Sequence, residues 1–213
     1  MSDIESSLVR TERALAAHPD DALLLHYRAY ALYRAGSTAM DASEVERARP
    51  YLASARAILE PLVMSTTIPE SYALLASVYG LQIATARVQM LAGMQLGSRA
   101  TEWMNRAVAA GPTNPRVWLL RGIGAFNTPS ALGGGLDKAE AYLTKSLVLM
   151  ATDSPDPPLP GWGRADAHLW LGQVYARQNK PDAARAEFRR AQALQPRNPW
   201  ISKVLLQSVG EQR

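Results

Sequence analysis

A stretch near the C-terminus constrains the fold more than any other part of the chain. It reads AHLWLGQVYARQNKPDAARAEFRRAQALQPRNP, over residues 167–199. The small residues are Gly172, Ala184 and Ala191, and the large ones are Leu171, Tyr175 and Phe188. Two antiparallel helices pack closely only where small side chains lie at their crossing, and large side chains one turn away fill the remaining gaps. The stretch therefore predicts a helical hairpin.

Earlier segments repeat this pattern of small and large residues. YALLASVY (72–79) overlays HLWLGQVY (168–175) and places Ala76 at the position of Gly172. In the same way, VWLLRGIGAF (117–126) places Gly122 there, and LLHYRAYAL (24–32) places Ala29 there. Repetition of one supersecondary unit is the usual signature of a solenoid, in which neighbouring units bury a continuous core.

The spacing Leu-Gly-x-x-Tyr, followed by Ala-x-x-x-Phe-x-x-Ala and then Pro196, resembles the tetratricopeptide repeat. The match is strongest over residues 165–198. The resemblance implies an all-α fold, a right-handed α–α superhelix (a TPR-like solenoid) of about four helical hairpins with a capping helix at each end. No strand-like alternation appears along the chain.

The expected organisation is one TPR-like domain over residues 1–213. We expect hairpins at about 21–64, 69–111, 115–150 and 165–195, and capping helices at about 3–17 and 199–209. These units are longer than a plain repeat of about 34 residues, so the excess falls in longer helices and loops. We assign it to a turn at 36–43 followed by a capping box of Ser43 and Glu46, and to loops at 127–135 and 152–163.

Charge and composition exclude several classes of protein. The chain has 23 Lys plus Arg against 19 Asp plus Glu, and no basic run exceeds two residues, so we expect no nucleic-acid partner. It has no cysteine, which excludes disulfides and thiolate chemistry. No apolar run is long enough to span a membrane. MSDIESSLVR has no apolar signal region, so we expect a cytoplasmic protein as given, or a periplasmic one if a leader was removed.

Three consecutive glycines, Gly133 to Gly135, precede an expected helix in NTPSALGGGLDKAE (127–140). A phosphate-binding loop needs Gly-Lys-Ser/Thr after a strand, whereas here the glycines follow a helix and lead into Leu-Asp-Lys. We expect Asp137 to cap the helix, which disfavours an anion site beside Lys138. The interpretation is therefore a structural turn, although the loop could form one edge of a groove.

No set of residues in the sequence predicts catalysis or metal binding. His18, His26 and His168 lie in different segments without partners at metal-ligand spacing, and no nucleophile elbow is present. We therefore expect a protein that is not an enzyme and has no catalytic residue, metal or cofactor. PDPPLP (155–160) is interpreted as a stiff linker rather than a polyproline ligand. Trp162 and Trp200 are expected to attach irregular segments to the helices.

The resemblance implies a binding surface, because the first helices of stacked hairpins line a concave groove. The residues predicted to face it are His26, Tyr30, Tyr33, Arg34, Ser77, Arg116, Ile123, Asn127, Gln173 and Arg177. Arginine binds carboxylates and tyrosine gives rigid contact area, so the expected ligand is a peptide or protein segment, with an acidic group as one option. The alternative is an oligomeric accessory or scaffold subunit of a transport or envelope system that uses its outer face. Packing against the inserted segments would also explain several of these residues.

Overall fold

A computed structural model describes residues 3–198 and 200–202. Over these residues the chain forms α-helices and one 3₁₀ helix, with no β-strand. The helices are α1 (Asp3–Ala17), α2 (Ala22–Asp41), α3 (Val45–Ser65), α4 (Pro69–Thr85), α5 (Gln89–Ala110), α6 (Pro115–Asn127), η1 (Ser130–Leu132), α7 (Leu136–Met150), α8 (Arg164–Arg177) and α9 (Pro181–Leu194). The all-α prediction is therefore confirmed. Most of the predicted C-terminal capping helix lies outside the described residues.

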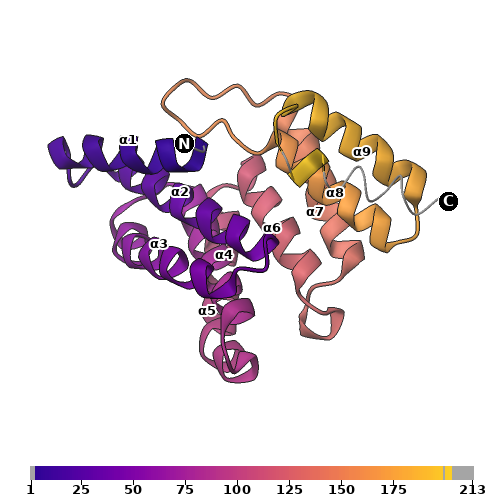
Figure 1. The fold of residues 1–213 in the computed structure, drawn as a ribbon, viewed down its shortest axis with the longest axis horizontal. Coiled ribbons are helices and arrows are strands. Elements are labelled where there is room, and N and C mark those ends of the chain that lie inside the picture. Colours follow the sequence, from indigo (N-terminus) through magenta and orange to yellow (C-terminus); the bar gives the residue numbers. More distant parts are fainter. Residues whose placement is uncertain (1–2, 199, 203–213) are drawn as a thin grey trace. The chain divides into compact units, whose positions relative to one another are not determined.

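Contacts divide the chain into two compact units, Met1–Pro112 and Thr113–Arg213. In unit 1, α1 lies on α2, α2 pairs with α3, and α4 pairs with α5 (Figure 1). In unit 2, α6 pairs with α7 and α8 pairs with α9. Each unit thus contains two helical hairpins. The organisation as a single domain stays a prediction.

Local chemistry explains where several helices begin. The Asp21 carboxylate accepts hydrogen bonds of 2.9 Å from the backbone N–H groups of Leu23 and Leu24, which caps α2. Pro69, Pro115 and Pro181 occupy the first helical positions of α4, α6 and α9, where a missing N–H is tolerated and φ is already helical. The Asn114 side chain also caps α6 by accepting from the Arg116 N–H.

Glycine and a large side chain meet inside three of the four hairpins. A Cβ added at Gly172 would lie 2.4 Å from the Phe188 ring, and one at Gly122 would lie 2.7 Å from Leu143. These contacts are those that the small and large residues of the repeat predict. In the first hairpin a contact of this kind joins Gly36 and Leu52, at 2.8 Å, and Ala29 is fully buried.

The predicted turn at residues 36–43 is wrong. Helix α2 continues to Asp41. Because Gly36 has no side chain, Leu52 of α3 can pack closely against it, and this packing keeps the stretch helical. The predicted capping box also fails. Ser43 adopts the left-handed conformation, and Glu44 occupies the cap of α3 without a capping hydrogen bond from its side chain. The polar residues that suggest a turn here lie partly within a helix, since tertiary packing overrides their local preference.

Candidate functional site

The predicted groove residues of unit 1 lie on α2 and α4, and two of them are buried. His26 has no exposed surface, and its Nδ1 lies 2.9 Å from the Ser71 Oγ on α4. Tyr33 is also buried, and its ring stacks on Tyr30 with the centroids 6.5 Å apart. His26 and Tyr33 therefore contribute mainly to packing within the unit.

The remaining residues of this face are half-buried. The Arg34 guanidinium donates to the Tyr30 hydroxyl at 3.5 Å, one helical turn away. The Ser77 hydroxyl donates to the Ala73 carbonyl at 2.9 Å, within α4. A ligand approaching α2 would therefore meet an aromatic ring with a cation beside it, from Tyr30 and Arg34.

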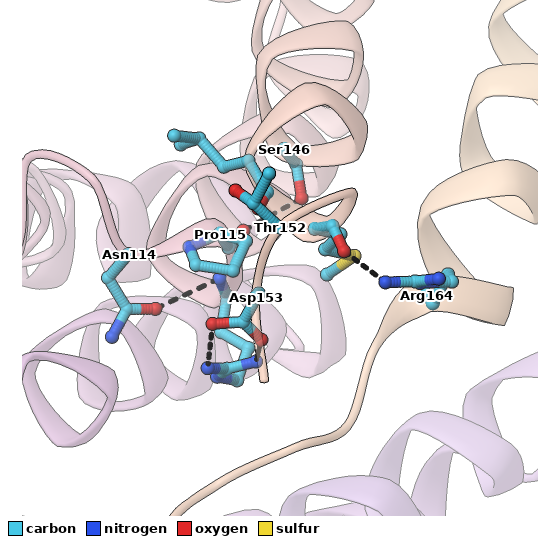
Figure 2. A network of polar contacts seen from close by, with 9 residues as sticks. Asn114, Pro115, Ser146, Thr152, Asp153 and Arg164 are labelled. Atoms are coloured by element: carbon cyan, nitrogen blue, oxygen red, sulfur yellow. Dashed lines mark hydrogen bonds and ion pairs between the residues drawn. The ribbon is translucent and has the colours of Figure 1, made fainter. Parts of the chain in front are cut away.

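In unit 2, Arg116 lies under the segment that joins α7 to α8. Its side chain is 4 % exposed and forms two charged hydrogen bonds with Asp153, of 2.7 and 3.1 Å. Figure 2 shows the surrounding polar contacts: the Ser146 hydroxyl donates to the Pro115 carbonyl at 2.7 Å, and Arg164 donates to the Met150 carbonyl. The Asp153 contact attaches the start of the 152–163 segment to α6, and the Arg164 contact joins the residue after the segment to the end of α7.

The same segment also covers Leu119, one helical turn before Ile123 on α6. Gly163 has φ +108°, and a Cβ there would lie 2.7 Å from Leu119 on α6. Trp162 packs against the hydrophobic core around Leu119, and Trp200 packs against the cluster around Phe188, as expected for residues that attach irregular segments. The N-terminal half of the α6 face is therefore closed by the chain itself. The 12 residues of this loop follow no regular pattern, so the sequence did not predict where the loop would lie.

The C-terminal half of the same face keeps exposed polar groups. Arg177 at the end of α8 is exposed, and its guanidinium carbon lies 4.0 Å from the centre of the Phe126 ring. Gln173, one turn earlier on α8, is half-buried. On α6, Ile123 packs against the core and Asn127 is exposed, with its side-chain amide donating to the Ile123 carbonyl at 2.9 Å.

Two aromatic residues of this half-face were missed by the sequence reasoning. Phe126 and Trp170 meet edge to face, with centroids 5.2 Å apart, and Arg177 lies over Phe126. The signal was available, because Phe126 lies four residues after Gly122 and Trp170 two residues before Gly172. A cation over an aromatic face has a defined position, so the ring orients the guanidinium. We call Ile123, Phe126, Asn127, Trp170, Gln173 and Arg177 the open half-face.

The triple glycine forms a tight turn. Gly133 and Gly135 have φ of +89° and +108°, which glycine adopts without steric cost. The Gly135 N–H donates to the carbonyls of Ala125 and Thr128, at the end of α6. The Lys138 ammonium donates to the Gly133 carbonyl at 3.0 Å, so it contacts the loop itself. The predicted cap is wrong: Gly135 precedes α7, and Asp137 lies within its first turn.

Replacing Gly134 with alanine should lower the free energy of unfolding by about 2 kcal/mol or more. A Cβ there would lie 2.1 Å from the Thr128 carbonyl oxygen, a backbone atom that the turn holds in place. Urea unfolding followed by circular dichroism measures the change. The matched control is Gly124→Ala, inside α6 with nothing within 4 Å, which should raise stability by about 0.5–1 kcal/mol. Equal changes in both variants would contradict the steric explanation.

Histidines and carboxylates do not gather into a metal site in the part of the chain that the structure describes. His168 lies 2.6 Å from Glu187, on α9, and this pair links the two helices of the last hairpin. No helix among the described residues is long and apolar enough to cross a membrane.

Comparisons with known proteins place this geometry among helical repeats. Residues 165–198 match the family model of the tetratricopeptide repeat. TTC0263, a thermophilic TPR protein of Thermus thermophilus, is 21 % identical, with a TM-score of 0.67 over 97 % of this chain and 90 % of that chain. This chain has a tetratricopeptide-repeat-like fold.

A second solved structure shares the tetratricopeptide-repeat-like arrangement. The HusA haemophore from Porphyromonas gingivalis is 22 % identical, with a TM-score of 0.56 over 82 % of this chain and 85 % of that chain. A search of curated proteins finds no match. A tetratricopeptide-repeat-like fold suggests a protein–protein interaction module, and proteins of this repeat family are generally non-catalytic scaffolds.

Proposed function

We propose that this chain is a non-catalytic interaction module and that the open half-face of unit 2 binds a peptide or protein segment carrying a carboxylate. The observation that supports it most is the exposed Arg177 guanidinium, held over the Phe126 ring at 4.0 Å. A planar guanidinium in a fixed position can donate two parallel hydrogen bonds to a carboxylate. Trp170 supplies apolar contact area beside it.

The other side chains of the open half-face suit an extended segment. Gln173 and Asn127 carry amides, which can both donate to and accept from a peptide backbone. In unit 1, Tyr30 and Arg34 form a second, separate patch of similar chemistry, with Ser77 on the neighbouring helix. Arg116 has a different role in this proposal, because its guanidinium binds Asp153 of the same chain.

Arg177→Ala should weaken partner binding by about tenfold or more, because a bidentate charged contact is lost. The measurement is an affinity pull-down from the source lysate with the wild type, Arg177→Ala and Arg189→Ala, followed by titration of the recovered partner. Arg189 is an exposed arginine of α9 in the same unit and serves as the matched control. Unchanged melting temperatures would show that both variants are folded.

A partner lost only from Arg177→Ala supports the open half-face as the binding site. A partner that binds all three proteins equally contradicts it. In that case the comparison is repeated with Arg34→Ala. Loss of the partner from this variant would assign the binding site to the patch of unit 1.

The second candidate is an oligomeric accessory or scaffold subunit that uses its outer face. Exposed apolar side chains on α5 favour a contact on that face. Its role in a transport or envelope system stays a prediction, as does the compartment.

A further inference from the structure

Helix α5 is long, and little of its surface is used inside the chain. It spans Gln89–Ala110, yet Ala107 is its one buried residue. Within unit 1 it packs extensively on α4 alone. A surface helix of a globular protein normally buries an apolar stripe and exposes charged residues. On α5 the exposed side of the N-terminal half is apolar instead.

Four large apolar side chains are exposed at the start of this helix. The exposed fractions are 57 % for Val88, 78 % for Met90, 51 % for Leu91 and 75 % for Met94. Residues 88–98 include no charged residue. Contiguous exposed apolar surface of this kind usually marks an interaction site, and methionine side chains adapt readily to a partner surface.

A polar cluster on α3 and α4 lies close enough to α5 to interact with the charge of Arg99. The Tyr79 hydroxyl and the Arg56 guanidinium donate to the Glu60 carboxylate at 2.7 and 2.8 Å. Burial alone would raise the pKa of Glu60, but these hydrogen bonds and the charges of Arg56 and Arg99 outweigh it, and the pKa is lowered. The positive charge of Arg99 is thus already used within unit 1.

The outer side of α5 is self-complementary when two copies run antiparallel. Leu91, Met94, Gln95, Ser98 and Glu102 recur at helical spacing and are all exposed. A two-fold axis between Met94 and Gln95 places Leu91 opposite Ser98 of the partner subunit. The same axis places Arg87, in the turn before α5, opposite Glu102 of the partner subunit, which already pairs with Arg106 of its own helix at 2.7 Å. Each Glu102 would then lie between two arginines, one from each copy, at the ends of the apolar centre.

We propose that α5 forms an isologous dimer contact with α5 of a second copy of this chain, in this antiparallel register. The contact has Leu91 and Met94 at its centre, Val88 and Met90 toward its periphery, and Arg87 and Glu102 at its ends. It is independent of the open half-face in unit 2. A single helix pair buries less than the roughly 1,200 Å² of ordinary stable interfaces, so the dimer is weak and depends on concentration.

Sedimentation velocity of the full chain tests the proposal. Between about 1 and 100 µM, a range that spans weak association, the average mass should rise from 23.2 kDa toward twice that value. The double variant Leu91→Ser/Met94→Ser should remain monomeric throughout. Val148→Ser, at another exposed apolar position on α7, is the matched control and should dimerise like the wild type.

Charge reversal tests the register. Arg87→Glu and Glu102→Arg should each weaken dimerisation by about tenfold, and the double reversal should restore it. Because the chain has no cysteine, Gln95→Cys should also give a disulfide-linked dimer under mild oxidation, whereas Val148→Cys should not. A monomer at every concentration overturns the proposal and leaves this face to another protein or a lipid surface. Dimerisation that the double reversal does not restore overturns the antiparallel register.

Discussion

Phe188→Ala should lower the free energy of unfolding by about 3–5 kcal/mol, as expected when a fully buried aromatic side chain is truncated. The Phe188 side chain is buried between α8 and α9, in a cluster with Leu169, Ala184, Ala191 and Ile201. Its ring also lies directly over Gly172. The truncation therefore removes apolar contact and leaves a cavity at the crossing of the hairpin.

Urea unfolding monitored by circular dichroism measures this loss. Leu194→Ala, on the same helix but 48 % exposed, is the matched control and should change stability by less than about 0.5 kcal/mol. Gly172→Ala should cost about 1–3 kcal/mol in the wild type, because the added Cβ would lie 2.4 Å from the ring. In the Phe188→Ala background that cost should disappear. Additive losses would show that the two residues are not coupled.

Arg116→Ala should lower the free energy of unfolding by about 3 kcal/mol, toward the low end for breaking a buried ion pair. The variant leaves the Asp153 carboxylate without its bidentate partner, although 22 % of that side chain remains exposed to water. Arg116→Lys should recover part of the loss, because lysine keeps the charge but cannot donate in the same forked geometry.

The control for this variant is Arg106→Ala. Arg106 pairs with Glu102 at 2.7 Å on the surface of α5, and exposed pairs of this kind contribute less than about 0.5 kcal/mol. Replacing Arg116 and Asp153 together with Met and Leu should cost less than the two single changes combined, because neither charge of this pair is then left facing an empty partner position. An Arg116→Ala variant as stable as the wild type would contradict the role of this pair.

This pair also decides how binding experiments are interpreted. An Arg116→Ala variant that loses a binding partner would have two explanations. The 152–163 segment could be displaced, or a direct contact between Arg116 and the partner could be lost. Arg177 is the better probe, because it is exposed and its guanidinium contacts a ring of the neighbouring helix.

Sequence reasoning predicted the positions at which helices approach one another. Gly172 with Phe188 follows from size alone, because a close crossing admits few combinations of side chains, and Gly122 occupies the same small position in the third hairpin. The environment of Arg116 could not be predicted in the same way. Its position on α6 resembles a groove position, but its partner lies 37 residues later in a loop with no regular pattern.

The turn assigned to residues 36–43 illustrates a second limit. Gly, Ser, Thr and Asp in that stretch favour a turn by local preference, yet α2 continues through Gly36. The deciding contact, with Leu52, belongs to the next helix and has no local signature. Local preference is therefore informative only where no close helix contact competes with it.

The segment between α7 and α8 has a consequence for how this repeat could change during evolution. Its two ends are held by Asp153 on Arg116 and by Gly163 against Leu119, whereas residues 156–159 are exposed. Residues 155–160 are a proline-rich, stiff stretch, but flexible residues inserted beside them would add closure entropy slowly, at about 0.6 kcal/mol for each doubling of a flexible loop. Added residues at 156–159 would leave both attachment points in place. New recognition elements could therefore be acquired there by insertion, without redesign of the helices beneath.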